Sequence, residues 1–261
     1  MFIVFVHTLL LASLAVWLYM SLMFIISVII KRNDIADVAW GFGFVVAALT
    51  GLIINHNTAL PALLTFSLVL IWGARLSLHI GLRNFKKAED FRYRTWRETW
   101  GRSFYLRSYL QIYMLQGLLL LLIVSPALLI TADAHGNINA LISLTTLLWL
   151  YGFIFEAVGD NQLTKFLKNP KNKGHIMQSG LWRYTRHPNY FGEITQWWAI
   201  GFIALNFDYG LLALIGPAVI TYLILRVSGV PLLEKKYANR PEYIAYKLKT
   251  SILIPLPTKN S

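Results

Sequence analysis

Residues 2–30 read FIVFVHTLLLASLAVWLYMSLMFIISVII and contain no Asp, Glu, Lys or Arg. A helix needs about 20 apolar residues to cross the hydrocarbon core of a bilayer, so this run is long enough to span one. It is also longer than the apolar region of a cleaved signal peptide, and no basic segment precedes it. The run therefore predicts an uncleaved first transmembrane helix.

The chain as a whole is also strongly apolar. Of its 261 residues, 56% are hydrophobic and only 14% are charged, and the mean hydropathy is +0.54. These values are typical of a polytopic membrane protein.

No internal repeat is visible, so an inverted-repeat transporter has no support. We predict an all-α membrane protein with about seven transmembrane helices in one domain, 1–261. After the first run, the apolar runs are 35–54, 60–80, 109–131, 140–158, 194–206 and 210–227. We expect the short sixth helix to begin inside the turn Tyr190–Glu193.

The net charge of +12 would indicate a nucleic-acid partner in a soluble protein, but here its distribution matters more. All but two of the Lys and Arg residues follow the first, third or fifth run or lie in the C-terminal tail. The loops near 55–59, 132–139 and 206–209 contain none. The positive-inside rule then places the N-terminus outside and the C-terminus in the cytoplasm. We expect a multi-pass protein of a bacterial inner membrane or the endoplasmic reticulum, with the lipid bilayer and no nucleic acid as partner.

The two remaining cations, Arg75 and Arg226, lie within or at the ends of the third and seventh runs. A charge in a membrane span costs several kcal/mol unless it is paired, so each is a candidate functional residue. A structural ion pair is an equally open interpretation for either one. Carboxylates near the same ends of the runs are Asp34, Asp37, Glu156, Asp160 and Glu193.

The segment Gly180–Glu193, GLWRYTRHPNYFGE, places three cations, a Pro and a carboxylate just before the sixth run. A plain headgroup anchor would use Trp, Tyr and Arg, but it would have no need of Asn189 and Glu193 at the mouth of a helix. The basic, Trp-containing loops could hold phosphates and flat rings, or they could attract anionic lipid. The aromatic residues in question are Trp96, Trp100, Trp182 and Tyr184.

Other common sites find little support in the sequence. The chain has no Cys, which excludes disulfides and thiolate chemistry. None of its six His residues lies three or four positions from another, so no helical metal site is predicted. The pair Gly41 and Gly43 lacks the third glycine of a dinucleotide fingerprint, and we interpret it as helix packing.

Several motifs together resemble the steroid 5-alpha-reductase-like membrane enzymes, including their bacterial branch. The C-terminal motifs are EAVGDNQL at 156–163, the segment 180–193, Arg226, LEKKY at 233–237 and RPEYIAY at 240–246. The upstream motifs are DIADVAWG at 34–41, WGARL at 72–76 and EDFRY at 89–93. The resemblance is specific over about the last hundred residues and looser before them.

The resemblance implies a seven-helix enzyme that uses NADPH to reduce a carbon–carbon double bond conjugated to a ketone. Its substrate would be a steroid-like or other lipophilic small molecule, the cofactor part would be mainly 156–261, and we expect a monomer. Positions that match cofactor-binding residues of the family are Asp160, Asn189, Glu193 and Arg226. The resemblance also suggests that further residues form the wall of the cofactor site, namely Arg186, His187, Tyr237, Tyr243 and Tyr246.

Negative charge builds on the ketone oxygen during such a reduction, so a hydrogen-bond donor or acid must face it. The Tyr and Glu that the steroid reductases use do not align with this chain. The nearest substitutes are Asp37 on the second run and Arg75 and His79 on the third, where the last two are four apart and share a helix face. For Asp37 and His79, packing roles are equally open.

The second candidate is an S-adenosylmethionine-dependent membrane methyltransferase of the isoprenylcysteine or phospholipid type. Its motif resembles RHPxYxGE at 186–193. The motif around Asp160, together with Asn189 and Arg226, fits the reductases better, so we favour the reductase. A channel or transporter would leave the basic and aromatic loops unexplained.

Overall fold

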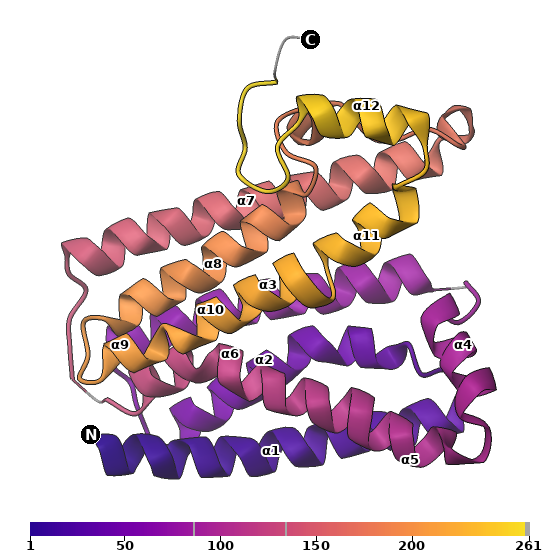
Figure 1. Cartoon of the computed structure of the whole chain (residues 1–261). Coiled ribbons are helices and arrows are strands. Elements are labelled where there is room, and N and C mark those ends of the chain that lie inside the picture. The colour runs from indigo at the N-terminus through magenta and orange to yellow at the C-terminus, as the bar shows by residue number, and fades with distance from the viewer. Residues whose placement is uncertain (86, 134, 259–261) are drawn as a thin grey trace. The chain divides into compact units, whose positions relative to one another are not determined.

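The computed structural model describes residues 1–85, 87–133 and 135–258, and it divides into two compact units. Unit 1 comprises residues 1–142 and 203–216, and unit 2 comprises 143–202 and the chain from 217 onward (Figure 1). Helices account for all the regular structure in the described residues, apart from one isolated bridge between Thr185 and Ser251. The predicted all-α fold class is confirmed. The predicted cofactor part, 156–261, lies in unit 2 except for residues 203–216.

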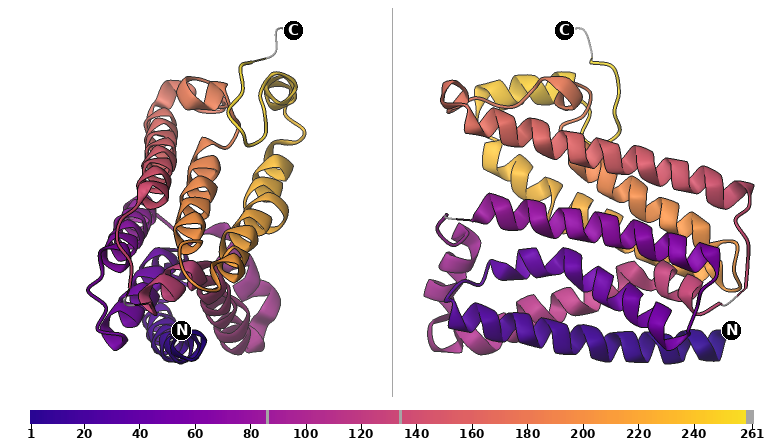
Figure 2. Two further views of the ribbon diagram at one scale, coloured as in Figure 1. Left: turned by 90° about the vertical axis from the view of Figure 1, so that its left-hand side faces the viewer. Right: turned by 180° about the vertical axis from the view of Figure 1, so that it is seen from behind.

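Unit 1 contains the first four predicted spans. Its elements are α1 (Phe2–Ile29), α2 (Ile35–Ile54), α3 (Leu60–Asn84), α4 (Phe91–Trp100), η1 (Gly101–Ser103), α5 (Phe104–Ser108), η2 (Tyr109–Met114), α6 (Leu115–Thr131) and α9 (Gly210–Ala213). The helix α2 packs against α1, α3 and α6 (Figures 1 and 2).

Unit 2 contains the remaining helices. Apart from the terminal residues that fall in unit 1, they are α7 (Ala140–Lys168), α8 (Pro188–Ala204) and α10 (Ile215–Tyr222). The shorter elements are η3 (Pro170–Asn172), η4 (Gly180–Arg183), η5 (Leu223–Val227), α11 (Val230–Tyr237) and α12 (Pro241–Lys249).

Six helical stretches in the described residues are long and apolar enough to cross a membrane, which supports an integral multi-pass protein. They coincide with the first five and the seventh predicted runs. The sixth predicted run corresponds to α8, which has 17 residues. That length lies at the lower end of the range of about 17–25 residues for a spanning helix.

The start of α8 differs from the prediction. The helix begins at Pro188, not inside the turn Tyr190–Glu193. Proline suits a first helical position because its missing N–H has no intrahelical partner there, and the hydroxyl of Thr185 accepts the N–H of His187 at 3.2 Å. Asn189 and Glu193 therefore lie one turn apart on the same helix. Apolar composition could not locate this start, because Asn189 in the first turn of α8 and Glu193 in the second interrupt the apolar run.

Glycines allow close helix contacts in both units. A Cβ atom on Gly41 of α2 would lie 2.5 Å from the carbonyl oxygen of Gly73 on α3. A Cβ on Gly192 of α8 would lie 2.4 Å from the carbonyl oxygen of Gly152 on α7. Small residues let membrane helices approach closely, and the interpretation of Gly41 as a packing residue is confirmed.

Candidate functional site

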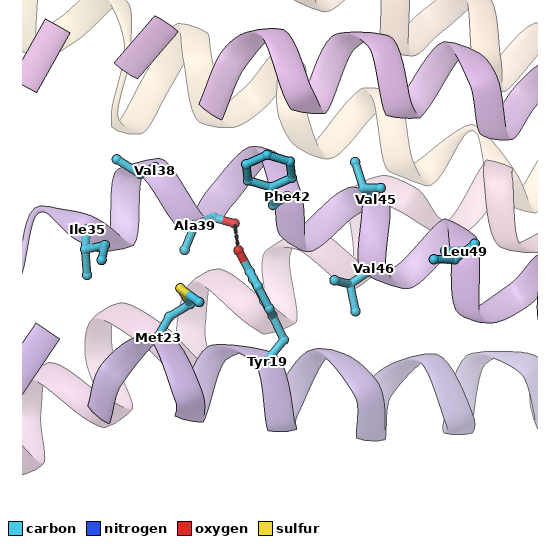
Figure 3. A pocket seen from close by; sticks show the side chains of 9 residues that line it. All are labelled: Tyr19, Met23, Ile35, Val38, Ala39, Phe42, Val45, Val46 and Leu49. Carbon is cyan, nitrogen blue, oxygen red and sulfur yellow. Dashed lines mark hydrogen bonds between the residues drawn. The ribbon is translucent and has the colours of Figure 1, made fainter. Parts of the chain in front are cut away.

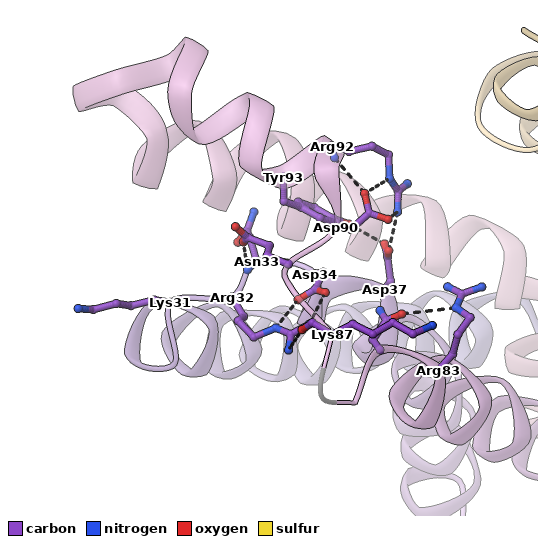
Figure 4. Close-up of polar contacts among 12 residues, drawn as sticks. Lys31, Arg32, Asn33, Asp34, Asp37, Arg83, Lys87, Asp90, Arg92 and Tyr93 are labelled. Atoms are coloured by element: carbon purple, nitrogen blue, oxygen red, sulfur yellow. Dashed lines mark hydrogen bonds and ion pairs between the residues drawn. The ribbon is translucent and has the colours of Figure 1, made fainter. Parts of the chain in front are cut away.

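The turn between α1 and α2 carries a polar cluster that includes the first turn of α4 (Figure 4). Arg32 donates two hydrogen bonds to the carboxylate of Asp34, at 3.1 and 2.8 Å. The backbone N–H of Asn33 donates to Glu89 at 2.6 Å, and Arg97 of α4 donates to the same carboxylate oxygen at 3.0 Å. Paired, hydrogen-bonded charges of this kind are what a partly buried helix junction requires.

Asp37, the first catalytic candidate, is held by α4. Arg92 donates to one of its carboxylate oxygens at 2.7 Å, and the hydroxyl of Tyr93 donates to the other at 2.6 Å (Figure 4). The Asp37 side chain retains 18% of its exposure. This carboxylate is therefore neutralised by an ion pair within unit 1, and its visible role is to join α2 to α4.

Arg75 and His79 lie one turn apart on α3, and both are half-buried. Gly73 and Ser77 of the same helix turn toward α2, where the Ser77 hydroxyl accepts the N–H of Phe42 at 3.0 Å. Arg75 and His79 each lie two positions after one of these residues, so their side chains point about 200° around the helix axis from the face turned to α2. The pair Arg75 and His79 thus shares a face, as predicted, but that face is not the one turned to α2.

Asp90 caps the N-terminus of α4. Its carboxylate accepts the backbone N–H of Arg92 at 2.9 Å and the Nε–H of the same residue at 3.0 Å. Burial opposes ionisation of Asp90, but these hydrogen bonds and the Arg92 charge outweigh it and hold the pKa of Asp90 below its ordinary value. The cap is therefore charged at neutral pH and stabilises the start of α4.

An apolar groove of about 330 Å³ lies between α1 and α2 (Figure 3). The only polar side-chain group in its lining, the hydroxyl of Tyr19, donates to the carbonyl of Ala39 at 3.1 Å. Its lining is Tyr19, Met23, Ile35, Val38, Ala39, Phe42, Val45, Val46 and Leu49. Since α1 and α2 are both candidate spans, an acyl chain or another lipophilic molecule matches this groove chemically.

In unit 2, the segment 180–193 is fastened to α7. The indole N–H of Trp182 donates to the carbonyl of Gly159 at 3.1 Å, and Gln162 accepts the N–H of Leu181 at 3.0 Å. Next to these contacts, the Asn189 amide donates to Asp160 at 3.2 Å. Two predicted cofactor residues that lie 29 positions apart in the sequence are thus brought together at the start of α8.

Arg186 is committed to the protein itself. Its Nε–H donates to Glu234 at 2.9 Å, and one terminal nitrogen donates to the carbonyls of Lys247 and Thr250, at 3.1 and 2.7 Å. The side chain keeps only 5% of its exposure. This arginine fixes the segment before α8 to α11 and α12, which leaves little of its guanidinium for a ligand phosphate.

Glu234 is the centre of this arrangement, although its place in the motif LEKKY was the only sequence feature that pointed to it. It also accepts the hydroxyl of Tyr243 at 2.6 Å and lies 3.2 Å from the ammonium of Lys247. The Nε2 atom of buried His187 lies 3.5 Å from it. We name the set Arg186, His187, Glu234, Tyr243 and Lys247 the Glu234 cluster.

The three tyrosines proposed for the cofactor wall line the C-terminal part of unit 2. Tyr246 is buried, and its hydroxyl donates to the carbonyl of Trp182. Burial is the main cause that raises the pKa of Tyr243 above its ordinary value, and the hydrogen bond that its hydroxyl donates to Glu234 raises it further. Burial likewise raises the pKa of Tyr246. Tyr237 is half-buried, with its ring centroid 5.5 Å from that of Tyr243.

The remaining cofactor candidates lie on α8 and η5. The indole of Trp198 on α8 donates to Thr221 on α10 at 3.0 Å, and the chain between the two helices contains the short helix α9. Asn189 precedes Trp198 on α8, and Arg226 follows Thr221 on η5, the continuation of α10. Asn189 and Arg226 therefore lie toward the same end of the helix pair α8 and α10. Arg226 is exposed, and within the described residues nothing bonds to its guanidinium. Glu193 is half-buried.

A second polar contact joins α7 and α8 deeper in unit 2. The amide of Gln196 donates to Glu156 at 2.6 Å, and both side chains are almost completely buried. Glu156 lies one turn before Asp160 on α7, so the two polar contacts follow each other along one helix interface. From the sequence, Glu156 was a possible partner for a cation and the first residue of the motif at 156–163, and its bond to Gln196 was not predicted.

The family model described as "Protein of unknown function (DUF1295)" matches residues 23–250. The chain belongs to this family. The match covers both units, including the polar cluster of Figure 4 and the Glu234 cluster. No curated protein and no solved structure matches this DUF1295 member.

Proposed function

We propose that this DUF1295 member is an NADPH-dependent membrane oxidoreductase that reduces a carbon–carbon double bond conjugated to a ketone. Its substrate would be a steroid-like or other lipophilic molecule that reaches the protein through the bilayer. The strongest support is the contact between Asp160 and Asn189, two matching positions of the reductase motifs that adjoin each other at the start of α8.

The side chains near this contact suit a dinucleotide. An Asn amide can pair with the nicotinamide carboxamide, and a carboxylate such as Asp160 or Glu193 can accept ribose hydroxyls. Arg226 would bind phosphate, because its guanidinium is exposed and uncommitted within the described residues. Arg186 and the buried tyrosines would instead shape the wall that supports these groups.

Bound NADPH would supply a hydride to the conjugated double bond. The protein must then stabilise negative charge on the ketone oxygen and deliver a proton to the neighbouring carbon. Arg75 and His79 remain our candidates for contact with that oxygen. Asp37 is a weaker candidate because Arg92 and Tyr93 already occupy both of its oxygens.

The proposed topology has seven spans, with α8 as the sixth, an external N-terminus and a cytoplasmic C-terminus. The cation-free loops near 55–59, 132–139 and 206–209 favour this orientation. It exposes the cytoplasmic ends of α7 and α8 to NADPH. Reporter fusions that place residues 81–108 outside would overturn both the topology and the cofactor.

Ligand-dependent thermal unfolding tests the cofactor. A ligand that binds the folded state raises its stability by mass action, so we expect NADPH to raise the Tm of the purified protein more than NADH does. The reason is that additional cations would bind the 2′-phosphate. Stabilisation by S-adenosylmethionine, with no response to NADPH, would favour the methyltransferase instead.

Arg226→Ala tests the assigned binding residue, and Lys165→Ala is its matched control because Lys165 is also an exposed cation of unit 2. We expect Arg226→Ala to weaken NADPH binding by about 1.5–3 kcal/mol, the range for a hydrogen bond to a charged group. Lys165→Ala should cost under about 1 kcal/mol. Unchanged NADPH affinity in Arg226→Ala and Glu193→Ala, with normal thermal stability, would place the cofactor elsewhere.

A further inference from the structure

We propose that α12 and the segment 250–256 form a lipid-docking surface that binds the anionic headgroup region of the membrane. The helix α12 is apolar on two sides. Tyr243 and Tyr246 are buried against the rest of unit 2, whereas Ile244 and Leu248 point outward and are 49% and 73% exposed. A surface helix next to water normally presents a polar outer face. The outer face of α12 therefore indicates a second apolar environment.

The segment that follows α12 carries further exposed apolar side chains. The carbonyl of Ser251 accepts the N–H of Arg186 at 2.9 Å, and the N–H of Leu256 donates to the carbonyl of Tyr184 at 3.0 Å. These bonds fix the backbone at both ends. Between and beside them, Ile252, Ile254 and Leu256 remain exposed. Because the backbone is held, these apolar side chains form a preordered surface.

Positive charge borders the apolar face. Lys235, Lys236, Lys247 and Lys249 are all exposed. The chain beyond Asp208 has two acidic residues, and both already accept hydrogen bonds within the protein. Glu234 accepts from Arg186, and Glu242 accepts the backbone N–H of Ile176 at 3.0 Å. An apolar stripe flanked by lysines, with little competing negative charge, is the pattern that binds anionic lipid at an interface.

The attachment of α12 to α7 is consistent with an interfacial helix. Tyr246 donates to the carbonyl of Trp182, and the indole of Trp182 donates to Gly159 of α7. The end of α7 lies about two and a half turns beyond Gly159. The helix α12 is therefore fastened beside the last turns of a candidate membrane span, where interfacial helices insert, and it begins soon after the last candidate span ends at Tyr237.

This inference does not depend on the proposed cofactor. It concerns the outer side of α12, opposite to the buried tyrosines, and it assigns the headgroup region rather than a soluble protein as the partner. The lysine border supplies the reason: in the proposed topology α12 lies on the cytoplasmic side, where the leaflet is negatively charged and each nearby cation contributes to attraction.

The absence of cysteine from the chain permits a direct measurement of depth. Leu248→Cys and Asn239→Cys would each carry one nitroxide label, the second at an exposed position of the turn between α11 and α12. The full chain is placed in nanodiscs of phosphatidylcholine, with and without phosphatidylglycerol. Power-saturation EPR then compares access of dissolved oxygen, which concentrates in lipid, with access of a water-soluble nickel chelate.

We expect the label at 248 to be more accessible to oxygen than to nickel in anionic nanodiscs, and the label at 239 to show the reverse. Lys236→Gln with Lys249→Gln should shift the label at 248 toward nickel while leaving thermal stability unchanged. Equal nickel access at both positions would overturn the proposal, as would a label at 248 that both reagents fail to reach, which would indicate a protein partner or a second copy. Immersion that is the same in neutral and anionic nanodiscs would overturn the role of the lysines.

Discussion

Arg186 and Glu234 form an ion pair in which the Nε–H of the arginine donates to a carboxylate oxygen at 2.9 Å. The two residues lie 48 positions apart in the chain. Through them, the segment before α8 is joined to α11, and the other bonds of Arg186 extend the junction to the end of α12. The start of α8, with Asn189 on its first turn, is positioned by this junction.

Loss of Arg186 should destabilise the protein strongly. Arg186→Ala leaves two backbone carbonyls without their donor and removes the buried charge beside Glu234, and removing one partner of a buried ion pair costs about 3–5 kcal/mol. Arg186→Lys should restore only part of this, because an ammonium group cannot reproduce the planar fork of a guanidinium. Thermal unfolding in detergent measures the effect. Arg183→Ala, at an exposed arginine three positions earlier, is the control and should leave the Tm unchanged.

Gly192→Ala should separate α7 from α8. The added methyl group would lie 2.4 Å from the carbonyl oxygen of Gly152 and 2.5 Å from the backbone nitrogen of Glu156, so backbone rather than a side chain must move. We expect a loss of about 1–3 kcal/mol in the free energy of unfolding. Gly81→Ala on α3 is the matched control, because its nearest neighbour would be a Val38 methyl at 3.7 Å. It should be neutral or stabilising by up to about 1 kcal/mol, since Ala favours helix more than Gly does. Equal effects of the two substitutions would contradict the close contact.

Asp37→Asn distinguishes a structural carboxylate from a catalytic one. If its role is to join α2 to α4, the variant should lose about 2 kcal/mol of stability, the typical value of a hydrogen bond to a charged group. Tyr93→Phe removes the hydroxyl that donates to Asp37. The double variant Asp37→Asn with Tyr93→Phe should show a coupling energy of about 0.5–3 kcal/mol between the two positions. NADPH-dependent turnover per folded molecule should stay near the wild-type value. Normal stability together with a large fall in turnover would instead identify Asp37 as the acid.

Acid should weaken the cap of α4. Because the pKa of Asp90 is lowered in the folded protein, its contribution to stability is present above the pKa of an unfolded Asp, about 3.9, and is lost as pH falls through the folded-state pKa. We therefore expect the Tm difference between wild type and Asp90→Asn to be largest near neutral pH and to shrink below about pH 4. Thermal unfolding across this pH range measures it. A difference that does not change with pH would show that the charge of Asp90 contributes nothing.

The fold class and most of the span boundaries follow from the amino-acid sequence alone. Apolar run length is a local property, and a run long enough to cross a bilayer must be helical because lipid offers no partner for backbone N–H and C=O groups. The predicted runs 35–54 and 109–131 accordingly match α2 and the stretch from η2 to the end of α6. The packing role of Gly41 followed from the same reasoning, since a glycine within a long apolar run suits a close helix contact.

Which polar groups form contacts depends on the folded arrangement of the helices. The bond from Asn189 to Asp160, the central place of Glu234, and the occupation of Asp37 by Arg92 and Tyr93 all join residues far apart in the chain. A charged residue in a sequence has many possible partners at the same end of a bundle, and composition does not choose among them. The choice is made by backbone geometry, through the helix start at Pro188, the contact of Gly192 with Gly152, and the cap of α4 at Asp90, which together bring particular side chains within hydrogen-bond distance.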